Sequence, residues 1–176
     1  MPSLHRPRAR FLALVGSLAA APLAAALLAA CGGSTSPTSP TPSPLSQAQI
    51  QARYTSAATQ YNQSEVQIGL TVNAACDVGS PTAALSSCQT ALSQQRQAAI
   101  AYDNALRAIP FTGTAATDAS HLLSDDAAIE SLLEQAATAP SLATIANVEH
   151  QVIPLLATAA TAAKTLRADI GLPAPA

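Results

Sequence analysis

Residues 141–170 read SLATIANVEHQVIPLLATAATAAKTLRADI, and this stretch decides the fold class. With a step of about 100° per residue, its larger apolar side chains gather on one face of a helix. Gly171 and Pro173 follow as stop signals, and Pro154 falls on the opposite, solvent side. The stretch predicts an amphipathic helix with a core face of Ile145, Val148, Val152, Leu156, Ala159, Ala163, Leu166 and Ile170.

Three earlier segments carry the same period. The first runs from Leu45 to about Ala75, where Ser46 and Gln49 match a capping box. Its apolar face contains Ile50, Tyr54, Ala57, Tyr61, Ile68 and Val72.

The second and third predicted helices are bounded by turn residues. The second starts near Ser80-Pro81, with proline at the first helical position, and ends before residue 110. The third starts after Gly113, with Thr114 as its cap and Asp118 in its first turn, and ends before residue 140. Their apolar faces are Leu85, Cys88, Leu92, Ala99 and Leu106, and Leu122, Ile129, Leu133 and Ala136.

These helices define an all-α fold. The chain is 49% hydrophobic but only 3% aromatic, so its core must be built from Ala, Leu, Ile and Val, and Ala is the best helix former. No alternating strand pattern competes. Because short links favour antiparallel neighbours, we predict an up-down-up-down four-helix bundle. A three-helix core with one splayed helix is the alternative.

Cys76 and Cys88 are predicted to form a disulfide, because two cysteines in an exported domain pair more often than they bind metal. The bond constrains the helix boundaries, since its two α-carbons must lie within about 7 Å. A helix starting at Pro81 would place Cys88 two turns from its start. Either the chain leaves the first helix before Cys76, or the second helix starts later, where Ser86 and Gln89 offer another capping box.

The first thirty residues have the zones of an export signal. Three arginines precede an apolar run from Phe11 to Ala30, which ends in Leu28-Ala29-Ala30-Cys31. This ending resembles the lipobox of bacterial lipoproteins at every position. The resemblance covers only the leader and tether, and the rest of the chain matches no family that we can name.

The lipobox resemblance implies that the signal is cut before Cys31 and that the Cys31 thiol receives a diacylglyceryl group. The product would be anchored by lipid on the extracytoplasmic side of the cell membrane or outer membrane, and Gly32 in place of Asp resembles outer-membrane sorting. An uncleaved anchor helix is an alternative, because about 20 apolar residues can span a bilayer. A plain signal peptide, cleaved without lipidation, is the other alternative.

Residues 1–30 are therefore assigned to a signal peptide, 31–44 to a lipidated cysteine with a disordered Ser/Thr/Pro tether, and 45–176 to the helical domain. All ten acidic residues but only five basic ones follow Cys31, a formal charge of −5. We expect no nucleic-acid partner, because a basic patch is lacking. The expected partners are the membrane, through the lipid, and an envelope protein.

Polar residues on apolar faces are the candidate site. Arg96 and Asp103 share the face of the second helix, while Asp125 and Asp126 flank that of the third. Counting outward from the turn near residue 110 places Arg96 opposite this Asp pair and Asp103 near residues 121–122. The resulting candidate ligand-binding set is Arg96, Asp103, Asp126, His121 and Tyr61, with Tyr54 as an alternative to Tyr61.

These residues could line a ligand or metal pocket, or form an internal ion pair that sets the helix register. No residue is assigned as a metal ligand, because paired Glu-x-x-His motifs are absent. Glu130 and Glu134 are expected on a solvated face. The motifs of serine hydrolases, zinc proteases and nucleotide-binding loops are missing. We therefore expect a non-catalytic, membrane-anchored interaction or accessory protein without a cofactor. A small-ligand or metal-binding module is the alternative.

Overall fold

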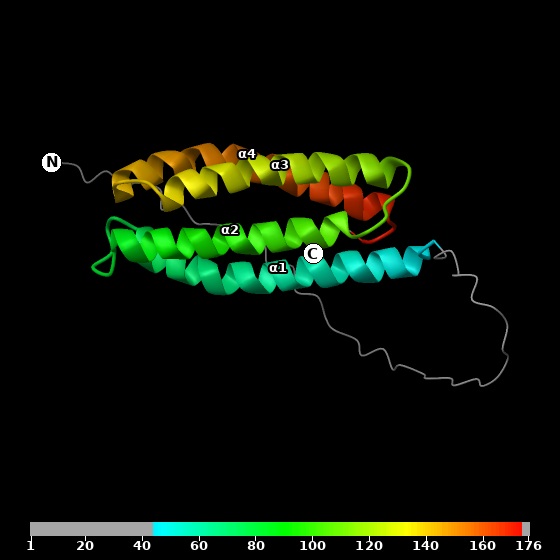
Figure 1. The fold of residues 1–176 in the computed structure, drawn as a ribbon, viewed down its shortest axis with the longest axis horizontal. Helices are drawn as coiled ribbons and strands as arrows, with labels where there is room; N and C mark the ends of the chain where they lie inside the picture. Colours follow the sequence, from blue (N-terminus) through cyan, green and yellow to red (C-terminus); the bar gives the residue numbers. More distant parts are fainter. Residues whose placement is uncertain (1–43, 174–176) are drawn as a thin grey trace, which may run out of the picture.

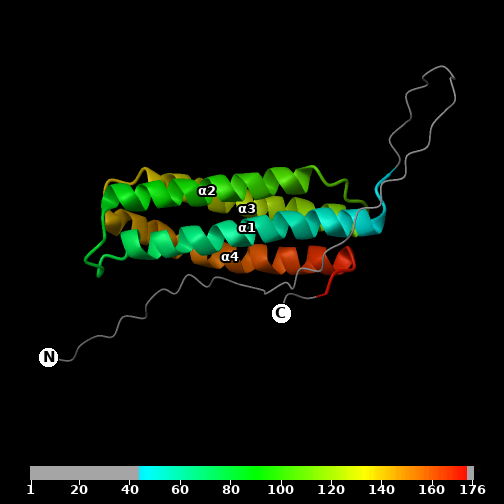
Figure 2. The same cartoon turned by 90° about the horizontal axis from the view of Figure 1, so that it is seen from below.

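Four helices form an antiparallel bundle. The computed structural model describes residues 44–173, and the predicted leader, Cys31 and tether lie outside them. The helices are α1 (Gln47–Cys76), α2 (Leu85–Arg107), α3 (Thr114–Ala137) and α4 (Leu142–Asp169). Successive helices run in opposite directions with nearly aligned axes (Figures 1 and 2). The predicted four-helix bundle is confirmed, and the splayed alternative is wrong.

The first and last helices close the bundle. The side-chain amides of Gln47 and Gln51 on α1 donate to the carbonyl oxygen of Ile170, just after α4, over 3.3 and 2.7 Å. Figure 2 shows α1 and α4 side by side at this end. Gly171 follows with a φ of 75°, a left-handed conformation that glycine adopts without strain.

The core is aliphatic and follows the predicted stripes. Every large apolar residue predicted for the faces of α2 and α3 is buried or partly buried. On α4 the prediction is wrong for Leu156, which is 39% exposed, while the adjacent Leu155 packs against the core. Between the buried residues Val152 and Ala159, the core face therefore passes through Leu155, one residue before the predicted position.

The disulfide between Cys76 and Cys88 is present, with a Cα–Cα distance of 4.9 Å. Cys76 is the last residue of α1, and Cys88 lies in the first turn of α2. The predicted start of α2 at Pro81 is wrong, and so is the capping box at Ser86. Instead, α2 starts after Ala84, which has no side-chain cap.

The link between α1 and α2 explains this late start. The backbone N–H of Ala84 donates to the Ala75 carbonyl over 3.0 Å, and the Thr82 hydroxyl donates to the Ala74 carbonyl over 3.0 Å. Residues 77–84 thus satisfy two of the carbonyl groups that the end of α1 leaves unpaired. The reversal of the chain over residues 77–84 also brings Cys76 and Cys88 together.

The helix starts follow local capping rules except at α3. Ser46 and Gln49 form the predicted capping box. At α3 the cap is Gly113, with a φ of 60°, so Thr114 is the first helical residue and not the cap. The first turn of α3 contains no acidic residue, and the prediction for Asp118 is also wrong.

The link between α2 and α3 sets the relative position of the two helices along the bundle axis. Residues 108–113 run onward along the bundle axis, and α3 starts beyond the end of α2 (Figure 1). Ile109 in this link is buried, and Phe111 packs against the core. The turn is therefore an extension of the core, and it shifts the axial register between the two helices.

Candidate functional site

Asp103 on α2 and Asp126 on α3 each have a buried carboxyl oxygen. Asp103 is 0% exposed, and its Oδ2 accepts a hydrogen bond of 2.9 Å from the guanidinium of Arg107, one turn further along α2. Within residues 44–173, Asp103 Oδ1 and Asp126 Oδ2 are both buried and have no hydrogen-bond partner. The Asp103 carboxylate is near enough to Asp126 to raise the pKa of Asp126 by charge repulsion.

Burial and like charge favour the protonated form of Asp126. Burial is the largest cause that raises the pKa of Asp126 to about 8, and the neighbouring Asp103 carboxylate adds to it. Burial also raises the pKa of Asp103, followed by the charge of Glu130, whereas the Arg107 guanidinium opposes this shift. These effects favour a neutral Asp126 carboxyl at neutral pH, whereas Arg107 favours the ionised form of Asp103.

Tyrosine side chains surround the pair. The rings of Tyr61 on α1 and Tyr102 on α2 stack with centroids 4.9 Å apart. The guanidinium of Arg167 on α4 lies 6.0 Å from the ring centroid of Tyr54. Burial raises the pKa of all three tyrosines above the usual value, so their hydroxyl groups are neutral.

A second group of polar contacts lies nearer the disulfide end. The Gln95 amide on α2 donates to Glu65 Oε2 on α1 over 2.9 Å, and burial raises the pKa of Glu65. Arg96 pairs with Glu134 of α3 over 3.1 Å, and Glu134 is 62% exposed. The contact of Gln95 with Glu65 links α1 to α2 inside the bundle, and the pair of Arg96 and Glu134 links α2 to α3 at its surface.

The structure brings together only part of the predicted set. Asp103, Asp126 and Tyr61 lie in one cluster. Arg96 does not face Asp125 or Asp126 as predicted, because it pairs with Glu134, two turns further along α3. His121 is exposed on α3 and lies away from the cluster.

The cause of these differences is the axial shift between α2 and α3. The sequence analysis paired residues of the two helices by counting outward from the turn near residue 110, as if the chain reversed immediately after α2. In the structure, residues 108–113 first advance along the bundle axis (Figure 1). Asp103 consequently meets Asp126 instead of residues 121–122. Glu130, expected on a solvated face, is close enough to raise the pKa of both aspartates.

The sequence analysis missed Arg107 and Tyr102. Arg107 could have been found, since it follows Asp103 at the i,i+4 spacing typical of helical ion pairs. Tyr102 lies on the flank of the apolar face, where the wheel does not distinguish a boundary residue from a buried one.

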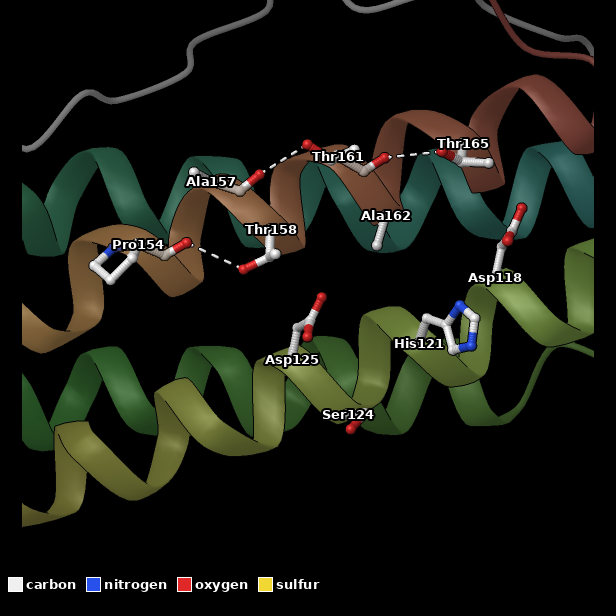
Figure 3. A pocket seen from close by; sticks show the side chains of 10 residues that line it. All are labelled: Asp118, His121, Ser124, Asp125, Pro154, Ala157, Thr158, Thr161, Ala162 and Thr165. Carbon is white, nitrogen blue, oxygen red and sulfur yellow. Dashed lines mark hydrogen bonds between the residues drawn. The ribbon is translucent and has the colours of Figure 1, made fainter.

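His121 belongs to an open groove of about 640 Å³ between α3 and α4 (Figure 3). Asp118, His121 and Asp125 line it from α3, and small residues line it from α4. The hydroxyls of Thr158, Thr161 and Thr165 donate to carbonyls of their own helix, as the dashed lines show. Across residues 44–173, no group of three His, Cys, Asp or Glu side chains is arranged to hold a metal ion.

The described residues thus define the class of protein as a disulfide-linked four-helix bundle with a polar layer inside. None of the four helices within residues 44–173 has the length and apolar character needed to cross a bilayer. Comparison with known proteins found no matching family model, no similar curated protein and no similar solved structure.

Proposed function

We propose that this chain is a lipid-anchored protein of the bacterial cell envelope, which acts outside the cytoplasm as a non-catalytic interaction or accessory protein. The observation that carries the proposal is the sequence Leu28-Ala29-Ala30-Cys31 at the end of an apolar run. Acyl chains on Cys31 would hold the bundle at a membrane, because each buried methylene contributes about 0.8 kcal/mol. The lipidated cysteine lies outside the described residues.

The disulfide supports an extracytoplasmic location. Such bonds persist in oxidising compartments and are rare where thiols are kept reduced. Here the bond joins Cys76 at the end of α1 to a fully buried Cys88 on α2.

The polar layer supports a structural role for Asp103 and Arg96. Each has a protein partner, Arg107 for Asp103 and Glu134 for Arg96. The groove between α3 and α4 and a shallow groove along α1 are lined by other residues. A polar layer of this kind selects which helices meet, in which register.

The lipid anchor is tested by the mass of the mature N-terminus. We expect cleavage before Cys31 and a diacylglyceryl group on its thiol. A Cys31→Ala variant should stay unprocessed or leave the membrane fraction, whereas Cys76→Ala, which removes a disulfide-bonded cysteine outside the lipobox, should remain anchored. A native protein in the cytosol with residues 1–30 intact would refute the proposal.

The alternative, a small-ligand or metal-binding module, makes a separate prediction. A ligand that binds the folded state raises the melting temperature by mass action. Metal analysis of protein purified without a tag, together with thermal shift against a ligand panel, therefore distinguishes the two functions. Specific stabilisation that Asp103→Asn or His121→Ala abolishes would favour the alternative.

A further inference from the structure

One face of α4 is apolar and yet exposed to solvent. Ile153 is 53% exposed and Leu156 is 39% exposed, and exposed alanines lie beside them. A charged residue lies at each end of this face. With a step of about 100° per residue, all of these side chains fall within about 100° of one another. The exposed α4 face consists of Glu149, Ile153, Leu156, Ala157, Ala160 and Lys164.

The positions on the exposed α4 face are symmetric about its centre, which lies between Leu156 and Ala157. Three residues further out on either side come Ile153 and Ala160. Each large apolar residue on the N-terminal side of the centre thus corresponds to an alanine on the C-terminal side. A two-fold axis through the centre would place each of these residues opposite its counterpart on a second copy of the helix.

The charged residues at the two ends continue this symmetry. Glu149 lies four residues before Ile153, and Lys164 lies four residues after Ala160. The two ion pairs found within residues 44–173 involve neither Glu149 nor Lys164. Glu149 is partly buried, and burial raises its pKa, so a cation placed beside it would favour its ionised form. The two ends of the face are therefore complementary in charge to each other.

We propose that the exposed α4 face binds a second copy of this chain, with the two α4 helices antiparallel across a two-fold axis. The large apolar residues of each copy then pack against the alanines of the other, which leave room for them. Glu149 of each copy meets Lys164 of the other, once at each end of the contact. Because both copies use the same face, the assembly closes at two chains.

This inference is independent of the proposed lipid anchor, because the exposed α4 face belongs to the folded bundle. A standard stable interface buries at least about 1,200 Å² in total. One helix face from each copy is a small contact by that measure, so the dimer should dissociate on dilution.

Reversal of the charges tests the pairing directly. Lys164→Glu places glutamates opposite each other at both ends of the contact, and Glu149→Lys places lysines opposite each other. Each variant alone should be monomeric at concentrations where the wild type is a dimer. An equal mixture of the two should form dimers again, because every contact then joins an acid to a base. The measurement is light scattering of the full chain in a non-ionic detergent, with the detergent mass subtracted.

Two further variants separate the exposed α4 face from general effects of charge. Arg53→Glu makes the same charge change as Lys164→Glu at an exposed position on α1, so it should dimerise like the wild type. Ile153→Ala leaves the charges unchanged and removes a large apolar side chain from the contact. It should weaken dimerisation several-fold.

Three results would overturn the proposal. A wild-type chain that stays monomeric at every concentration leaves the face to a different partner. Equal dissociation in Arg53→Glu would show a general effect of charge, and a mixture of the two reversed variants that stays monomeric would exclude the antiparallel pairing. If Glu149→Lys fails to fold, Lys164→Glu and Ala160→Glu decide, because both change exposed residues of the face. Both must then dimerise more weakly than Arg53→Glu, and wild-type affinity in either contradicts the contact.

Discussion

Asp103 and Arg107 show how one residue pair holds a charge inside an aliphatic bundle. The carboxylate is fully buried, whereas the guanidinium is about half exposed and keeps contact with water. A charge of this kind is tolerated only when its hydrogen bonds are made inside the protein. Arg107 provides such a bond to Asp103 Oδ2 over 2.9 Å.

Arg107→Ala should destabilise the bundle by about 1–3 kcal/mol, because a buried carboxylate loses a charged donor and water at the exposed rim replaces it only in part. The pKa of Asp103 should also rise further, since the guanidinium now opposes its increase. Urea unfolding at neutral pH measures the change. Arg53→Ala, an exposed arginine on α1, is the control and should change stability by less than about 0.5 kcal/mol.

Helix ends and links decide how the elements of this bundle meet. The end of α1 is satisfied by its own link and by the disulfide, and the end of α4 is bound by glutamines from α1. The α2–α3 link contributes a buried residue, Ile109, to the core. Local capping thus determines where each helix starts, while the links determine how far it is displaced from its neighbour.

Two glycines should respond oppositely to alanine. Gly171 has a positive φ, and an added Cβ would lie 2.9 Å from the Gln47 amide nitrogen, so Gly171→Ala should destabilise by about 1–2 kcal/mol. Gly69 lies inside α1 with open space around its Cβ position, so Gly69→Ala should stabilise by about 0.5–1 kcal/mol. Thermal unfolding of the two variants compares them, and a shift of the same sign in both would contradict this account.

Removing the disulfide should cost about 3 kcal/mol, because the closed loop restricts the unfolded chain. The measurement is urea unfolding of the oxidised and reduced protein. The helical content of the reduced form should be retained, since α1 and α2 also pack through Tyr61 and Tyr102. Loss of helicity on reduction would show that the bond is needed for the fold itself.

At the scale of the whole molecule, carboxyl groups with raised pKa values make the bundle less stable as the pH rises. Burial raises the pKa of Glu65, Asp126 and Glu149 above their usual values. A group that binds its proton more tightly in the folded state stabilises the protein while it is protonated. For Asp126 this contribution is complete below the usual aspartate pKa near 4, and it is lost as the pH rises toward 8.

The bundle should therefore be most stable in mildly acidic solution. From Asp126 alone, the unfolding constant should increase up to tenfold per pH unit between about pH 4 and about pH 8, or about 1.4 kcal/mol per unit. Urea midpoints measured across this range test the slope. In Asp126→Asn the slope of stability against pH should be smaller by up to about 1.4 kcal/mol per pH unit. A wild-type stability that increases steadily with pH would contradict a raised pKa of Asp126.

The sequence alone determined the helical class, the number of helices, the cysteine pairing and most buried faces. These properties depend on local periodicity and on residue types that act within one helix, as in the stripe from Ile145 to Ile170. Leu156 was misplaced because positions three and four residues after Val152 both fit a helical apolar face, and the structure buries the first of them, Leu155.

Only the tertiary structure decided which polar residues meet. A helical wheel gives the angle of a side chain but not its height relative to another helix. That height follows from the path of residues 108–113 and from the burial of Ile109. For this reason Asp103 contacts Asp126, Arg96 pairs with Glu134, and His121 lies in a separate groove.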